Sequence, residues 1–120
     1  MPLKIYTLST CDTCRRALQW LRQHEVAVDE QPIREHPPTT AELRAMLAAQ
    51  AGVVRRLFNT SGRDYRALGI GERLDSMPVE EAIKLLSTNG NLVKRPFLIG
   101  PGVALVGFDE VAWRAALSDS

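Results

Sequence analysis

The stretch STCDTCRRAL, residues 9–18, contains the only two cysteines of this 120-residue chain, Cys11 and Cys14. It follows the short apolar run LKIYTL, residues 3–8, which predicts a strand. A helix is predicted after it, because apolar residues recur at the spacing of one helical face: Cys14, Ala17, Leu18 and Leu21. The two cysteines therefore lie where a strand passes into a helix.

The middle of the chain predicts one further strand and then several helices. Residues 26–31 predict a strand that Pro32 closes, and Thr39 with Glu42 predicts a capped helix that ends at Gly52. The buried stripe of that helix is expected to be Leu43, Met46 and Leu47. Residues 53–75 have no clear period, and short helical turns are expected there.

A helix near residue 80 is predicted next, with Ser76 or Met77 as its N-cap, Pro78 in its first turn and Gly90 at its end. Its inner face is expected to be Val79, Ala82, Ile83 and Leu86. Residues 92–100 and 103–107, separated by Pro101 and Gly102, predict a hairpin of two strands. A last helix is predicted to begin at Asp109 and to pack through Val111, Ala112, Ala115 and Ala116.

This order of elements predicts an α/β fold in a single domain spanning residues 1–120. A strand, a helix and a second strand form a parallel pair with a right-handed crossover, and the late hairpin adds an antiparallel pair. We expect a four-stranded mixed sheet flanked by helices on both faces. The loop that holds Cys11 then lies at the carboxyl ends of the parallel strands, where α/β sheets usually place their chemistry.

Composition and charge exclude several classes of function. The formal charge is +1, with acidic and basic residues mixed along the chain, so no direct binding of nucleic acid is expected. No apolar run has the length of a membrane span, and no signal peptide is recognised, so a cytoplasmic protein is expected. Nothing in the sequence indicates an obligate oligomer, and a monomer is expected.

Two cysteines three residues apart, beside a strand–helix–strand pattern, predict a redox motif. The free N–H groups at a helix N-terminus stabilise a thiolate, so Cys11 is the expected nucleophile. Cys14 lies one turn later and is the expected resolving thiol, although an ordinary buried cysteine is the alternative. Arg15 and Arg16 add positive charge nearby, and Asp12 partly opposes them.

A structural zinc site needs four ligands. Besides the cysteines, the chain offers only His24 and His36, which are far apart in the sequence, so no metal site is expected.

The pair Arg95-Pro96 is the second feature of interest. A proline at the start of a strand suits either a cis bond that faces a catalytic loop or a trans bond at a sheet edge. Arg95 suits either an anionic substrate or the thiolate, or else a solvated surface position.

Four blocks together resemble the ArsC/Spx superfamily, in particular its Spx and YffB-like branches: TLSTCDTCRRALQWL, LFNTSGRDYRALGI, VKRPFLI and LVGFDE. The resemblance runs from residue 4 to about residue 117. It implies a thioredoxin-like fold with a helical insertion, which accounts for residues 53–75, and a cis bond at Pro96. It also implies that Cys11 is the nucleophile, that Arg15 is the basic residue after the motif and that Arg95 is the arginine before the proline. Substrate contacts are expected at Thr10, Asp12, Thr13, Asn59 and Pro96.

The chain also departs from one part of this superfamily. Its glutathione-coupled arsenate reductases carry two further arginines, where this chain has Asn59 and Gly107, and they lack the second cysteine. The two missing cations remove charge-assisted hydrogen bonds worth roughly 1.5–3 kcal/mol each. Arsenate reduction is therefore the hypothesis that the sequence opposes.

Two other hypotheses remain open. The first is a thiol–disulfide or glutathione-dependent reductase, with glutathione as co-substrate and no bound cofactor. The second, which Spx-like members suggest, is a redox-sensing transcriptional regulator that binds RNA polymerase. The CDTC and VGFDE motifs look closer to the YffB-like branch and favour the reductase.

Overall fold

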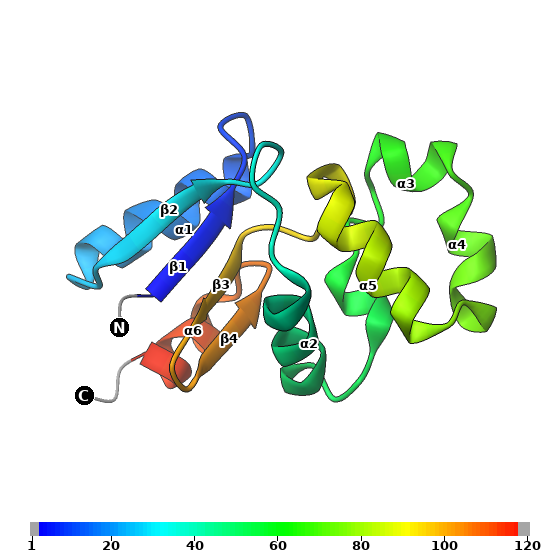
Figure 1. Cartoon of the computed structure of the whole chain (residues 1–120). Helices are drawn as coiled ribbons and strands as arrows, with labels where there is room; N and C mark the ends of the chain where they lie inside the picture. The colour runs from blue at the N-terminus through cyan, green and yellow to red at the C-terminus, as the bar shows by residue number, and fades with distance from the viewer. Residues whose placement is uncertain (1–2, 118–120) are drawn as a thin grey trace.

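A mixed sheet lies at the centre of the computed structural model, which describes residues 3–117 (Figure 1). Its four strands are β1 (Leu3–Thr7), β2 (Val28–Pro32), β3 (Phe97–Gly100) and β4 (Val103–Val106), in the spatial order β2-β1-β3-β4. β1 and β2 are parallel, whereas β3 is antiparallel to both β1 and β4. The predicted parallel pair and the predicted hairpin are both confirmed.

The helices follow the predicted order along the chain. They are α1 (Asp12–Gln23), α2 (Thr40–Ala49), α3 (Arg63–Ala67), α4 (Ile70–Arg73), α5 (Val79–Thr88) and α6 (Glu110–Leu117). Three short 3-10 turns join them: η1 (Val54–Leu57), η2 (Leu74–Ser76) and η3 (Gly90–Leu92). Residues 53–75 are therefore a run of short helical turns, as predicted, and Figure 1 shows α3 and α4 beyond the end of the sheet.

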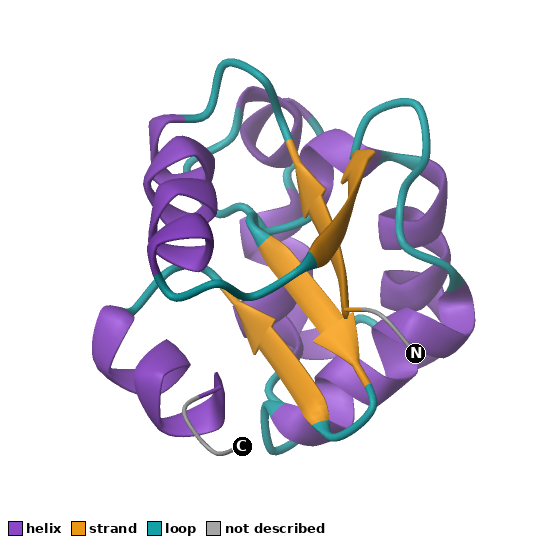
Figure 2. Ribbon diagram, turned by 90° about the vertical axis from the view of Figure 1, so that its left-hand side faces the viewer, coloured by secondary structure: helices purple, strands orange, loops and turns teal. Residues whose placement is uncertain are grey.

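Helices cover both faces of the sheet (Figure 2). Alternation along β1 places Ile5 on one face, in a core with Leu21, Leu98 and Trp113 that α1 and α6 cover. Tyr6 faces the other way, into a larger core that includes Phe97 and residues of α2 and α5. The predicted α/β fold, with a four-stranded mixed sheet flanked by helices, is confirmed.

Several boundaries differ from the prediction because neighbouring turns occupy the expected positions. α5 begins at Val79 with Pro78 as its N-cap, and neither Ser76 nor Met77 caps it, because η2 ends at Ser76. β2 begins at Val28 and includes Pro32 as its last residue. β3 begins only at Phe97, because η3 precedes it.

The predicted packing faces of the last two long helices were partly wrong. Val79 is 45% exposed and Val111 is 73% exposed. The predicted alanines of α6, Ala112, Ala115 and Ala116, are also exposed. α6 packs instead through Trp113, whose indole Nε1 donates a hydrogen bond to the Gly107 carbonyl oxygen at 3.1 Å. Trp113 thus anchors this short helix, and Leu117, one turn later, packs partly buried against the same core.

Glu42 joins the N-terminus of α2 to β1. Its carboxylate accepts hydrogen bonds from the Tyr6 hydroxyl at 2.6 Å, the Lys4 ammonium at 2.9 Å and the Thr39 backbone N–H at 3.0 Å. Burial raises the pKa of Glu42, but these donors together outweigh burial, so the pKa lies below its usual range. Burial, reinforced by the bond to Glu42, raises the pKa of Tyr6 to about 12.

Replacing this carboxylate gives the first testable prediction, Glu42→Gln. A folded-state pKa below the unfolded value stabilises the fold above the unfolded pKa, and that contribution is lost as the pH falls through the folded pKa. Urea unfolding at pH 7 is expected to show a loss of about 2 kcal/mol, the scale of hydrogen bonds to a charged group. The difference from the unmodified protein should shrink as the pH falls below about 4.3, the ordinary pKa of glutamate.

Glu80→Gln is the matched control, because Glu80 is exposed and, among the described residues, pairs only with Arg44 on the surface. Exposed ion pairs contribute little, so its effect should be small. A loss for Glu42→Gln that is the same at every pH would contradict this account.

Candidate functional site

Cys11 is the N-cap residue of α1. Its own N–H donates to the Leu8 carbonyl at 3.0 Å, and its carbonyl accepts the Arg15 N–H at 3.1 Å, which starts the helix. The backbone N–H of Cys14 donates to the Cys11 Sγ at 3.3 Å. A sulfur in this position accepts a hydrogen bond better as a thiolate, and the N-terminus of the helix favours negative charge there.

Cys14 lies one helical turn behind Cys11 and is buried, with 1% of its surface exposed. Cys11 is half-buried, and both thiols are free. Burial raises the pKa of the Cys14 thiol to about 12, and its contact with the Cys11 side chain adds to the rise. The positive charge of Arg95 acts in the opposite direction on the Cys14 pKa. The two thiols thus differ in access, with Cys11 facing solvent and Cys14 beneath it.

A cleft of about 500 Å³ opens in front of Cys11. The loop before α1, the turn before α3 and both ends of the β3–β4 hairpin contribute to it. The Arg95–Pro96 peptide bond is cis, as the resemblance implied, and the Gly107 N–H donates to the Pro96 carbonyl at 2.9 Å. That hydrogen bond ties the end of β4 to the segment that faces Cys11.

The cleft brings together four of the residues predicted for the site: Cys11, Thr13, Asn59 and Arg95. Pro96 is buried next to Arg95. The other predicted residues do not line the cleft.

Thr10 is exposed in the preceding loop. The guanidinium of Arg15 donates to the exposed Asp12 carboxylate, and both residues line a separate surface hollow along α1. The two residues therefore lie on a helix face next to the one that meets the cleft.

Three further charged residues line the cleft. Arg16 was expected to add positive charge near Cys11, whereas the sequence did not single out Lys94 and Asp109 for the site. Arg16 shares a helix face with Thr13, and its guanidinium lies 5.9 Å from the centre of the Phe108 ring. Lys94 and Asp109 come together with Arg16 only through the tertiary fold.

The Lys94 side chain lies next to Gly107, the position where the arsenate reductases of the superfamily are expected to carry an arginine. Gly107 has a φ of +72°, and a Cβ there would lie 2.9 Å from the Lys94 Cε. The glycine thus leaves room for the lysine side chain. The cleft therefore has three cations, Arg16, Lys94 and Arg95, against one carboxylate, Asp109.

Arg95 is only weakly paired within the protein. Its Nη1 donates to the carbonyls of Val93 and Asn91 at 3.4 and 3.5 Å, and its Nε is buried without a partner among the described residues. A guanidinium with unused donors beside a cleft can bind an anionic group.

Two other kinds of site are absent from residues 3–117. No group of three His, Cys, Asp or Glu side chains there is placed to hold a metal ion. No helix in that part of the chain is long and apolar enough to cross a bilayer.

Comparison with known proteins identifies relatives of this fold and site. The Bacillus subtilis protein YusI, which is named as uncharacterized, is 38% identical over 110 residues, covering 92% of this chain and 93% of YusI. The global transcriptional regulator Spx of Enterococcus faecalis is 31% identical over 108 residues, covering 90% of this chain and 80% of Spx. The chain is thus similar both to a protein without an assigned role and to a regulator.

Solved structures give the same result for the fold. A putative ArsC family related protein from Bacteroides fragilis superimposes with a TM-score of 0.90 at 35% identity, covering 97% of this chain and 98% of that protein. The model of the ArsC family matches residues 6–116, which include the whole cysteine motif and the cis-proline. The chain belongs to the ArsC family, as the resemblance in its sequence indicated.

Proposed function

We propose that this protein is a thiol–disulfide oxidoreductase that uses Cys11 as its nucleophile, Cys14 as its resolving thiol and glutathione as its reductant. One observation carries the proposal. The half-buried Cys11 Sγ accepts the Cys14 N–H at 3.3 Å at the start of α1, with the Cys14 thiol one turn behind it. Because this chemistry needs reduced thiols, the cytoplasm is the proposed compartment.

The first step is attack by the Cys11 thiolate on one sulfur of a small disulfide. A bond forms between Cys11 Sγ and that sulfur, the substrate's S–S bond breaks, and the leaving thiolate takes a proton from water. The cations of the cleft, Arg16, Lys94 and Arg95, favour the approach of an anionic disulfide.

In the second step Cys14 resolves the mixed disulfide. It gives up its proton and attacks Cys11 Sγ, which forms the Cys11–Cys14 bond and releases the second substrate thiol. Arg95 assists, because its positive charge lowers the pKa of Cys14 against the effect of burial. Two glutathione molecules then reduce the internal bond and leave as glutathione disulfide, so that the substrate gains the two electrons that glutathione loses.

Cys14→Ser tests the second step. After exposure of the reduced protein to glutathione disulfide, this variant is expected to accumulate with one glutathionyl group on Cys11, because no second thiol can displace it. Intact mass under non-reducing conditions measures the adduct. Cys14→Ala is the control for any effect of the serine hydroxyl and should behave in the same way. Turnover by Cys14→Ser at the unmodified rate would show that Cys14 does not resolve the intermediate.

A second candidate function has its own support in the similarity to a global transcriptional regulator over 90% of the chain. Here the Cys11–Cys14 pair would act as a switch, and its oxidation would alter a surface that binds RNA polymerase. Purified RNA polymerase offered to the reduced and the oxidised protein distinguishes the two roles. Binding that changes with oxidation supports the regulator, whereas no binding in either state opposes it.

A further inference from the structure

A second, smaller cavity of about 240 Å³ adjoins the Cys11 cleft. The two hollows share Asn59 and Arg95, so they lie side by side. The remaining wall comes from the segment after β2, which carries Arg34, from the start of α3, which carries Arg63, and from η3, which carries Asn91.

This cavity carries more positive than negative charge: its one carboxylate, Asp64, has a pKa below its usual range, chiefly because of hydrogen bonds from Asn89 and Asn91 and in smaller part because of the charges of Arg63 and Arg34. Three guanidinium groups line it, those of Arg34, Arg63 and Arg95. Within residues 3–117, none of the three forms an ion pair with a carboxylate. The hydrogen bonds from the Asn89 and Asn91 amides to the Asp64 Oδ2 are 3.1 and 3.2 Å long.

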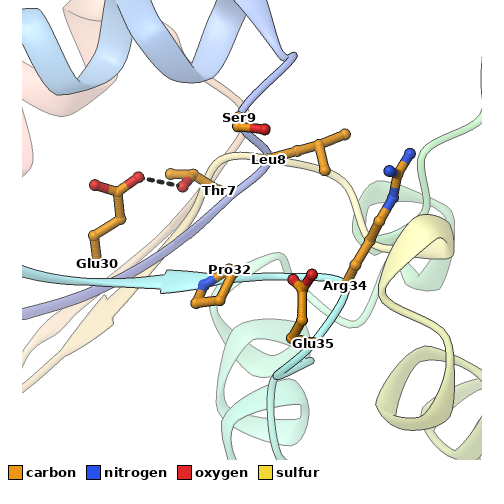
Figure 3. A pocket seen from close by; sticks show the side chains of 7 residues that line it. All are labelled: Thr7, Leu8, Ser9, Glu30, Pro32, Arg34 and Glu35. Carbon is orange, nitrogen blue, oxygen red and sulfur yellow. Dashed lines mark hydrogen bonds between the residues drawn. The ribbon is translucent and has the colours of Figure 1, made fainter.

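Arg34 is held in place while its terminal nitrogens stay unused. Its Nε donates to the Asn91 Oδ1 at 2.6 Å, and the structure gives its Nη atoms no partner among the described residues. In Figure 3 the Arg34 guanidinium extends away from Glu30 and Glu35, and the Glu30 carboxylate instead accepts the Thr7 hydroxyl at 2.6 Å. The guanidinium of Arg34 is therefore held by Asn91 and has no acidic partner among the described residues.

Close packing also positions Asn59 in the wall. A Cβ at Gly62 would lie 2.7 Å from the Asn59 Nδ2, so the glycine leaves space for the amide that both hollows share. Polar groups fixed in this way need little rearrangement to bind a ligand.

From this arrangement we infer that the cavity is a carboxylate-binding subsite, in which Arg34 and Arg63 select a small thiol that bears a free carboxylate, such as glutathione. This inference rests on the proposed function. Guanidinium groups match the two oxygens of a carboxylate, and glutathione carries carboxylates on both sides of its sulfur. The sulfur would lie at Cys11 while one carboxylate enters the cavity beyond Arg95.

The test compares two disulfides on the double variant Arg34→Gln/Arg63→Gln. The rate of Cys11 oxidation is measured with glutathione disulfide and with 2-hydroxyethyl disulfide, which has no carboxylate. The ratio of the two rates is expected to fall about tenfold, equivalent to about 1.4 kcal/mol of lost discrimination. The double variant Arg22→Gln/Arg73→Gln removes the same charge outside the cavity and should keep the original ratio.

Three outcomes would overturn the inference. The first is an unchanged rate ratio in Arg34→Gln/Arg63→Gln, and the second is an equal fall of the ratio in the control variant. The third arises when the rate is also measured with a capped peptide disulfide that contains glutamate: the double variant slows oxidation by that peptide but not by glutathione disulfide. The last outcome would assign the subsite to a protein substrate.

Binding of S-methylglutathione, which cannot react, separates failure of the subsite from failure of the proposed chemistry. Its binding is followed by NMR at the Asn59 and Asn91 side-chain amides. If S-methylglutathione binds the unmodified protein and binds the double variant Arg34→Gln/Arg63→Gln more weakly, the subsite is supported even if Cys11 proves unreactive toward disulfides. No binding to the unmodified protein opposes it even if Cys11 reacts.

Discussion

Cys11→Ser is expected to reduce disulfide exchange to the uncatalysed rate. A serine hydroxyl is not ionised at neutral pH and forms no disulfide, so neither the attack nor the mixed disulfide can occur. The remaining thiol cannot replace it, because Cys14 is 1% exposed and burial raises its pKa to about 12. The measurement is the initial rate of glutathione release from glutathione disulfide.

Cys14→Ser is the comparison that distinguishes the loss of the nucleophile from the loss of the resolving thiol. It keeps the exposed nucleophile, so it should release the first glutathione at close to the unmodified rate and then stop. Urea unfolding of both variants shows whether each one folds. A folded Cys11→Ser protein that still exchanges disulfides would contradict the assignment of the nucleophile.

Gly90→Ala is expected to have the largest effect on stability. Gly90 is buried in η3, where it packs against the chain that follows β2. An added Cβ would lie 1.9 Å from the Ile33 carbonyl oxygen and 2.7 Å from its carbonyl carbon, which is backbone and cannot rotate away. The two segments would have to separate, and overpacking of this severity costs about 3 kcal/mol or more. Urea unfolding measures the loss, which shows as a lower yield of folded protein if the variant is too unstable to purify.

Gly71→Ala is the matched control. Gly71 lies in α4, and a Cβ there would meet only the Tyr65 ring at 3.4 Å, an ordinary contact. Alanine is also the better helix former, so this change should alter the free energy of unfolding by no more than about 1 kcal/mol. Equal effects of the two substitutions would show that the contact with Ile33 does not govern Gly90.

The features that the sequence predicted well depend on residues that are close together in the chain. The capping box of Thr39 and Glu42 is present in full, and Cys14 lies on the buried face of α1, as its spacing required. Gly90 shows where such reasoning stops. The sequence placed it at the end of a helix, whereas its main constraint is the carbonyl of Ile33, which lies far away in the chain.

The site was predicted in part for the same reason. Cys11, Thr13, Asn59 and Arg95 do meet in one cleft, but Lys94 and Asp109 join them only through the β3–β4 hairpin and its return toward β1. Arg15 illustrates a finer limit. It lies one residue before Arg16, and both guanidinium groups pair with Asp12, but only Arg16 also lines the cleft. A motif places a residue on an element, while the packing of that element decides which face meets the cleft.

The central claim is that Cys11 and Cys14 form a redox pair, and a peptide map tests it most directly. Reduced protein is treated with one equivalent of glutathione disulfide, quenched with acid and digested with trypsin without reductant. Cleavage after Lys4 and Arg15 releases both cysteines in the single peptide IYTLSTCDTCR, residues 5–15. The account predicts this peptide lighter by two hydrogens, with the glutathione released as free thiol. Two unmodified thiols after the treatment, or glutathione attached to Cys14 in place of Cys11, would contradict it.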